Sequence, residues 1–359
     1  MRDGRSWLRA VGCGVALAWV GATGGAGQGV DTARLRVRLA TDEADAVMAV
    51  LEKRAAGRTV EDADWARLFG SEGYRRLKER ERSMGRPLED STFRAFVLSD
   101  SLLARAPELR RALEARRRAD PAAAARRAFV YLPAGARIRA TVYPVIKPSG
   151  NSFVFDVKRD PAIFLYLDPA VDRARFENTL AHELHHIGYG TVCDDAFADV
   201  PEPTRTALQW LGAFGEGLAM LAAAGGPDVH PHATSPVADR ERWDRDVAHF
   251  DADLADVQAF LLDVLDGRLR APEQIQEKAM SFFGVQGPWY TVGWKMAVVV
   301  ERTFGRPRLV AASCDPRRFL AAYDAAAALH ERRTGERLSR WSPELLRRIG
   351  AAPRAAGGR

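Results

Sequence analysis

Ten residues, AHELHHIGYG at positions 181–190, constrain this chain more than any other stretch. Apolar side chains recur around them at helical spacing, at Phe176, Leu180, Leu184 and Ile187. Such a stripe predicts an amphipathic helix. We expect it to begin after Asp172, whose carboxylate suits a helix N-terminus, and to stop near Gly188 or Gly190.

Two histidines on this helix are placed to share one metal ion. His182 and His186 are four residues apart, so their Cβ atoms would lie on one face, about 5–6 Å from each other. Glu183 could take a proton from a water molecule held at the same metal. His185 points about 100° away from both, which predicts a packing or supporting role. Taken singly, each histidine is an ordinary surface or core residue, so the metal site needs support from elsewhere in the sequence.

Glu216 is the candidate for a third ligand. It is the only charged residue between Arg205 and Asp228, and a carboxylate in so apolar a helix is costly unless it is paired or binds a metal. The surrounding small residues would let two helices approach closely: Gly212, Ala213, Gly215, Gly217 and Ala219. The alternative is an ordinary glutamate at a helix bend, or one paired with an arginine.

The H-E-x-x-H pattern and the glutamate 30 residues further on resemble the ligand set of the gluzincin branch of the zincin metallopeptidases. The stretches HELHH, FGEGLAM and WYTVGWKMA, within residues 162–305, also resemble an uncharacterised bacterial family of zinc-dependent peptidases. The resemblance implies one Zn²⁺ per chain, held by His182, His186 and Glu216. It further implies a peptide or protein substrate, hydrolysed by a zinc-bound water that Glu183 activates.

Some positions depart from related families. Gluzincins similar to thermolysin carry an acidic residue a few positions after the glutamate ligand, where this chain has Ala219 and Met220. The longer metzincin motif is disfavoured, because Tyr189 and Val192 stand at its positions. A carboxylate that orients a metal-bound histidine would have to come from elsewhere. The nearest candidates in sequence are Asp194, Asp195 and Asp199.

Three further residues are candidates for stabilising the oxyanion of a tetrahedral intermediate. Tyr290, in GPWYTVGWK, resembles the tyrosine donor of such peptidases, with a core aromatic as the alternative. His230 and His232, in a proline-rich loop, could line the cleft or be plain loop residues. Two other functions stay open: a catalytically silent protein that keeps the zinc fold for binding or regulation, and an enzyme that hydrolyses a non-peptide amide or ester.

The fold class that we expect is α+β and mostly helical, resembling zincins. Three stretches rich in β-branched and aromatic residues, at 137–146, 153–157 and 162–167, predict a small antiparallel sheet next to the metal helix. In zincins the edge strand of this sheet pairs with an extended substrate, and we expect 162–167 or its neighbour to do so.

The chain divides into four predicted regions. Residues 1–26 resemble a signal peptide, with three arginines, an uncharged run and a small-residue stretch. Residues 27–130 form a helical region, with helices expected near 31–56, 60–83 and 89–117. Residues 131–305 form the zincin-like core, and 306–359 form C-terminal helices and a disordered tail.

The net charge and the cysteine content limit which partners and which cellular compartment we expect. The formal charge of +6 is too small to imply a nucleic-acid partner. We expect export to the periplasm or the exterior, with no membrane contact beyond a possible uncleaved N-terminal anchor. Cys193 and Cys314 would then pair in an oxidising compartment or remain buried thiols. Nothing in the sequence indicates the oligomeric state.

Overall fold

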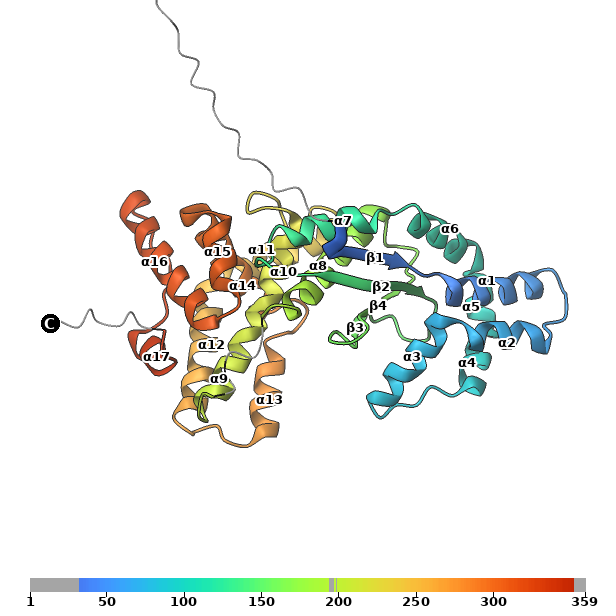
Figure 1. Ribbon diagram of the computed structural model, residues 1–359, viewed down its shortest axis with the longest axis horizontal. Helices are drawn as coiled ribbons and strands as arrows, with labels where there is room; N and C mark the ends of the chain where they lie inside the picture. The colour runs from blue at the N-terminus through green and yellow to red at the C-terminus, as the bar shows by residue number, and fades with distance from the viewer. Residues whose placement is uncertain (1–31, 194–196, 198, 352–359) are drawn as a thin grey trace, which may run out of the picture.

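The computed structural model describes residues 32–193, 197 and 199–351. Helices lie at both ends of an elongated molecule, with a small sheet between them (Figure 1). The N-terminal helices are α1 (Asp42–Ala55), α2 (Asp62–Gly70), α3 (Glu72–Ser83), α4 (Asp90–Val97), α5 (Asp100–Ala104) and α6 (Ala106–Arg117). The predicted signal peptide, residues 1–26, and the last eight residues lie outside the described part of the chain.

The helix expected over 31–56 is wrong in its first part. A short 3₁₀ helix, η1 (Thr32–Arg34), leads into strand β1 (Leu35–Leu39), and α1 begins only at Asp42. The sequence LRVRL alternates apolar and arginine residues with the period of a strand, and the segment gains backbone hydrogen bonds by joining the sheet. The helix expected over 60–83 breaks at Ser71, whose hydroxyl accepts a hydrogen bond from the backbone of Tyr74 and caps α3.

The sheet has four strands in the order β1-β2-β4-β3. The other three are β2 (Ile138–Val145), β3 (Phe153–Phe155) and β4 (Ala162–Tyr166). Strands β1, β2 and β4 are mutually parallel, and β3 alone runs antiparallel, against β4. The α+β class is confirmed, and the sheet is mixed.

The predicted antiparallel sheet is therefore wrong, although its three strands exist close to the expected bounds. After β2 the chain crosses over to β3 at the far side of β4, and a tight connection then returns it along β4. Strand β4 consequently runs in the same direction as β2. Propensity locates strands, but it carries no information on which strands become neighbours. Strand β4 is interior, so the predicted edge strand can only be its neighbour β3.

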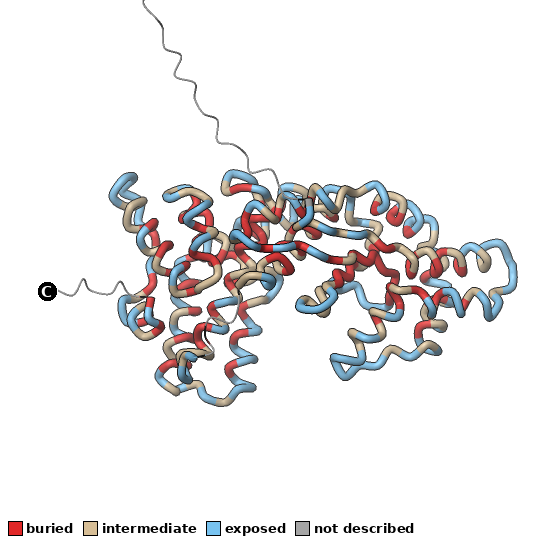
Figure 2. The backbone as a smooth tube through the Cα atoms, viewed as in Figure 1, coloured by how far each residue is buried: buried red, intermediate tan, exposed pale blue. Residues whose placement is uncertain are grey.

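Each face of the sheet has its own apolar core. Ile163 and Leu165 of β4 face α7 (Pro121–Phe129) and α8 (Arg173–Gly190), whereas Phe164 faces Leu77 of α3. Buried residues accordingly follow the sheet and the helices that cross it (Figure 2). This packing holds α8 firmly against one face of the sheet.

The remaining helices form a larger core of their own. They are α9 (Thr204–Leu211), η2 (Gly212–Phe214), α10 (Gly215–Ala224), α11 (Val237–Ala248), α12 (Phe250–Leu265), α13 (Pro272–Ser281), α14 (Pro288–Phe304), α15 (Arg306–Ser313), α16 (Pro316–Thr334) and α17 (Pro343–Arg348). The segment Thr204–Ala224 has the length and hydropathy of a membrane span, but 61% of its apolar window is buried in this core. It behaves as a core element, interrupted by a 3₁₀ turn directly before Glu216.

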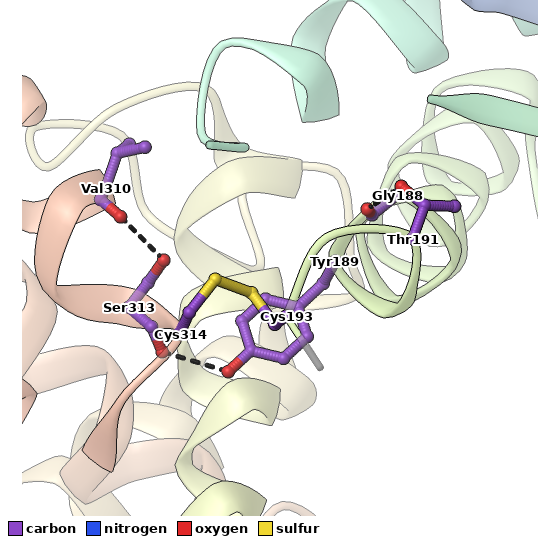
Figure 3. Close-up of a disulfide and its surroundings, with 7 residues drawn as sticks. All are labelled: Gly188, Tyr189, Thr191, Cys193, Val310, Ser313 and Cys314. Atoms are coloured by element: carbon purple, nitrogen blue, oxygen red, sulfur yellow. Dashed lines mark hydrogen bonds between the residues drawn. A yellow bond between two sulfur atoms is a disulfide. The ribbon is translucent and has the colours of Figure 1, made fainter. Parts of the chain in front are cut away.

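A disulfide joins the end of α8 to the C-terminal helices. Cys193 and Cys314, 121 residues apart in sequence, are bonded to each other. Beside the bond, the Tyr189 hydroxyl donates a hydrogen bond to the backbone carbonyl of Ser313 over 2.9 Å (Figure 3). Of the two states that the sequence left open for these cysteines, the paired one is present.

Candidate metal centre

Helix α8 carries the first two candidate ligands and forms as the sequence predicts. Asp172 caps it, accepting a hydrogen bond from the backbone N–H of Arg175 over 2.8 Å. The helix ends at Gly190, whereas Gly188 lies inside it. A Cβ atom at Gly188 would lie 2.2 Å from the Leu132 side chain. Glycine at this position therefore lets α8 pack closely against the loop before the sheet.

Glu216 is placed by an unusually close contact between α10 and α14. A Cβ atom at Gly217 would lie 2.1 Å from the backbone nitrogen of Trp294, and one at Gly293 would lie 2.8 Å from the carbonyl oxygen of Phe214. The predicted close approach of two helices is confirmed at Gly217. At Gly215 an added Cβ would meet nothing within 4 Å. The contact brings Glu216, in the first turn of α10, next to Tyr290, in the first turn of α14.

The three candidate ligands converge on one point. Oε2 of Glu216 lies 3.1 Å from Nε2 of His182 and 3.2 Å from Nε2 of His186, and the two nitrogens are 3.0 Å apart. Atoms bound to one tetrahedral zinc ion at about 2.0–2.1 Å are about 3.3 Å from one another. The donor set and its spacing therefore fit a single zinc ion. Within the described ranges, no other cluster of three metal-ligating side chains is this compact.

The charges of the site suit a cation. Burial alone would raise the pKa of Glu216, but His186 and His182 outweigh it and hold that pKa well below its usual range. Burial alone would lower the pKa of His186, but the Glu216 carboxylate prevails and raises it. An ionised carboxylate thus faces two imidazole nitrogens inside a partly dehydrated site. A divalent cation satisfies all three ligands at once.

Glu183 and Tyr290 border the same point. The Tyr290 ring stacks on that of His182, with centroids 6.3 Å apart and planes 19° apart. Burial, followed by the negative charges of Glu216 and Glu183, raises the pKa of Tyr290 well above its usual range. The Glu183 charge also contributes to raising the pKa of His186. The structure therefore gathers His182, Glu183, His186, Glu216 and Tyr290 in one place.

His185 lies behind the site, as expected from its position on the helix. It is 2% exposed and packs against Tyr189. Burial, together with His186 and His182, lowers the pKa of His185 to about 3, although a hydrogen bond to the backbone of Tyr131 opposes the shift. The ring is therefore neutral and acts in packing.

The outer ring nitrogen of His182 has no supporting acceptor within the described part of the chain. Nδ1 of His182 is buried and has no hydrogen-bond partner within 32–193, 197 and 199–351. Of the three acidic candidates, Asp199 is exposed and makes no hydrogen bond to either ligand histidine. Asp194 and Asp195 lie outside the described residues. An unpartnered Nδ1 on a metal-ligating imidazole is the atom that a supporting acceptor normally binds.

The two loop histidines differ from each other. His230 is half-buried and pairs with Asp244 over 3.1 Å. His232 is 7% exposed, and its ring is tilted by 52° against that of Trp243, with centroids 5.3 Å apart. Neither has a recorded contact with the three ligands. Trp243 contacts His232 and also Trp294, a residue that was not predicted from the sequence although it follows Tyr290 by one helical turn.

Comparison with known proteins places the chain in a family. A family model described as "Putative zinc dependent peptidase (DUF5700)" matches residues 65–332. The chain belongs to this family. The match covers more than half of the sequence and all five residues of the site, so the predicted resemblance to a zinc-dependent peptidase family is confirmed. The description of the family suggests a zinc-dependent peptidase, which is a hydrolase. No curated protein and no solved structure matches the chain.

Proposed function

We propose that the protein is a zinc-dependent peptidase of the gluzincin type. The observation that carries this proposal is the convergence of Nε2 of His182, Nε2 of His186 and Oε2 of Glu216 within 3.2 Å of one another. Bound there, one zinc ion would polarise the scissile carbonyl and lower the pKa of water to about 7. Glu183 and Tyr290 supply the remaining groups of the reaction.

Glu183 is the proposed general base. It lies on α8 directly after a ligand histidine and is partly exposed, so a water molecule can reach its carboxylate. It takes a proton from the attacking water and passes it to the amine that leaves when the peptide bond breaks. The same side chain thus acts first as base and then as acid.

Tyr290 is the proposed oxyanion donor. Its pKa is raised by burial and by two nearby carboxylates, so the hydroxyl keeps its proton at neutral pH. A protonated hydroxyl beside the scissile carbonyl can donate a hydrogen bond to the oxygen that becomes negative. Its stacking on His182 fixes where that donor lies.

We also propose that the protein acts outside the cytoplasm on a peptide or protein. The Cys193–Cys314 disulfide supports this, since structural disulfides persist in oxidising compartments. The charged leader at residues 1–26 agrees with it.

Glu183→Gln tests the mechanism. We expect one zinc per chain, as in the wild type, and a fall in peptide turnover of about a hundred- to ten-thousandfold, because only the proton transfer is lost. Elemental analysis and a quenched-fluorescence peptide library measure the two quantities. Glu108→Gln, at an exposed position on α6, is the matched control. If Glu183→Gln turns over peptides as fast as the wild type, the mechanism is contradicted. If the zinc-loaded wild type cleaves no peptide, the result favours the catalytically silent alternative.

A further inference from the structure

A wall of polar side chains continues from the metal centre along α14 and α11. Trp294 follows Tyr290 by four residues on α14, so both side chains lie on one face of that helix, and Tyr290 stacks on His182. Arg175 precedes His182 by two turns of α8, on the same face. Its guanidinium lies 3.1 Å from Asp239 of α11. Helix α11 therefore reaches the first turn of α8, two turns before His182.

Buried polar atoms without partners gather in this wall. Among the described residues, three such side-chain atoms belong to this one region of the fold, namely Oγ1 of Thr234, Nε of Arg242 and Nε1 of Trp294. His232 and Gln286, which share a side-chain hydrogen bond, lie beside them. We call these five residues, His232, Thr234, Arg242, Gln286 and Trp294, the polar wall. Buried polar groups almost always have hydrogen-bond partners, so a cluster without them points to a ligand.

The members of the polar wall are neighbours. Trp243 joins two of them, with its ring centroid 5.3 Å from that of His232 and 5.6 Å from that of Trp294. Burial lowers the pKa of His232, a side-chain hydrogen bond with Gln286 opposes the shift, and the positive charge of Arg242 contributes to the lowering. Gln286 also adopts a left-handed backbone, with φ of 71°. A non-glycine residue pays for that conformation, and such residues cluster at ligand sites.

The chemistry of the polar wall favours an acceptor that carries negative charge. The indole N–H of Trp294 and the Nε–H of Arg242 can only donate hydrogen bonds. Arg175 and Arg242 share a single carboxylate, Asp239, at 3.1 and 3.0 Å, which leaves one positive charge in excess among the three. His232 is neutral in this environment, because burial lowers its pKa. A carboxylate matches both the donors and the charge.

We propose that the polar wall is a substrate subsite that binds a carboxylate of the peptide, with Trp294 and Arg242 as its donors. This inference rests on the proposed peptidase function and narrows its substrate class to peptides that place a carboxylate beside the metal. Two sources supply that group: the free C-terminus of the peptide, or the side chain of an aspartate or glutamate. The first would make the enzyme a carboxypeptidase, and the second an endopeptidase selective for acidic residues.

Matched peptides separate these sources. One quenched-fluorescence peptide of fixed core is made with a free or an amidated C-terminus, and with glutamate or glutamine at each position near the cleavage site. We expect the zinc-loaded wild type to prefer one carboxylate-bearing form by roughly ten- to a hundredfold in kcat/KM, through KM. Preference for the free C-terminus identifies the first source, and preference for glutamate the second. Equal kcat/KM for all forms overturns the inference.

Two variants and a control test whether the preference for a carboxylate-bearing peptide comes from the polar wall. Arg242→Gln removes the charge, and Trp294→Phe removes the indole N–H together with one of its two rings while keeping a six-membered aromatic ring. We expect both to bring the preference towards unity, whereas Arg245→Gln, at an exposed position of the same helix, retains it. A preference that survives both variants overturns the inference.

A binding assay keeps the inference separate from catalysis. Fluorescence anisotropy measures the same peptides on zinc-loaded Glu183→Gln, with and without Arg242→Gln. Tighter binding of the carboxylate form that depends on Arg242 supports the subsite even if no peptide is cleaved, in which case only the proposed function fails. Equal binding of all forms overturns the subsite while leaving the peptidase function to stand on its own turnover.

Discussion

Two buried glutamates, one at each side of the sheet, show what makes a buried carboxylate functional. Glu43 and Glu216 both lie in the first turn of a helix, α1 and α10. Glu43 is 1% exposed, and burial raises its pKa to about 8. Glu216 is also largely buried, yet its pKa is held low because His186 and His182 face it. Burial acts on both carboxyl groups in the same direction, and the two converging histidine nitrogens reverse the shift only at Glu216.

The partners of Glu43 explain its opposite behaviour. Its Oε2 accepts a hydrogen bond from the backbone N–H of Ile146 over 3.0 Å, and its Oε1 is buried with no partner among the described residues. Asp42 and Asp45 add negative charge nearby, and Lys147 opposes them only in part. Glu43 is thus a carboxyl that links α1 to the end of β2 in its neutral form. The helix N-terminus and the apolar setting by themselves do not make a metal site.

The largest expected difference between Glu216 and Glu43 is in the zinc content of variants that lack one carboxylate or the other. We expect Glu216→Ala to weaken zinc binding by more than about a hundredfold, because even the groups that merely support metal ligands are worth ten- to a hundredfold. Glu43→Ala should retain about one zinc per chain. Elemental analysis of both variants after dialysis measures the difference. Equal zinc in the two variants would remove Glu216 from the metal site.

The second-largest expected effect concerns Glu43 and the way in which the stability of the protein depends on pH. The folded-state pKa of Glu43 is raised from 4.5 to about 8, so the stabilisation from its neutral form is complete below about 4.5 and is lost as pH rises towards about 8. Glu43→Gln stays neutral and should avoid a loss on the order of 4 kcal/mol at the upper end of that range. Urea unfolding across this pH range tests it, with the exposed Glu108→Gln as control. Parallel pH profiles for wild type and Glu43→Gln would refute it.

The disulfide should stabilise the metal-binding side of the molecule. Cys193→Ser with Cys314→Ser opens a loop of 121 residues and should lower the free energy of unfolding by about 3 kcal/mol. Reduction of the wild type should reproduce the loss, and urea unfolding measures both. A double variant as stable as the oxidised wild type would show that packing alone holds α8 to the C-terminal helices.

The helix contact behind Glu216 should give the smallest of these effects. Gly217→Ala places a Cβ atom 2.1 Å from the backbone of Trp294, so α14 must move, at a cost of about 2 kcal/mol. Zinc affinity should fall with it. Gly215→Ala, two residues away, meets nothing within 4 Å and should be neutral or stabilising by up to about 1 kcal/mol. If both variants behave alike, the close contact does not position Glu216.

Local patterns were the reliable part of the prediction. The stripe around His182 and the cap at Asp172 located α8, because both signals act within a few residues. The strands near 138–145, 153–155 and 162–166 were found for the same reason. Two predictions are wrong for different reasons. The helix expected over 31–56 overlooks the local alternation of LRVRL, which forms β1. The antiparallel sheet is wrong because strand order depends on connections that no local pattern encodes.

The sequence by itself determined the ligand types, their spacing on α8 and the membership of a zinc-dependent peptidase family. An i, i+4 pair of histidines lies on one helix face whatever surrounds it. Only the tertiary structure decided that Glu216 meets those histidines while the more deeply buried Glu43 does not, and that Trp243 joins His232 to Trp294. Helix period is a property of the backbone, whereas the meeting of residues from α8, α10, α11 and α14 depends on how whole helices pack.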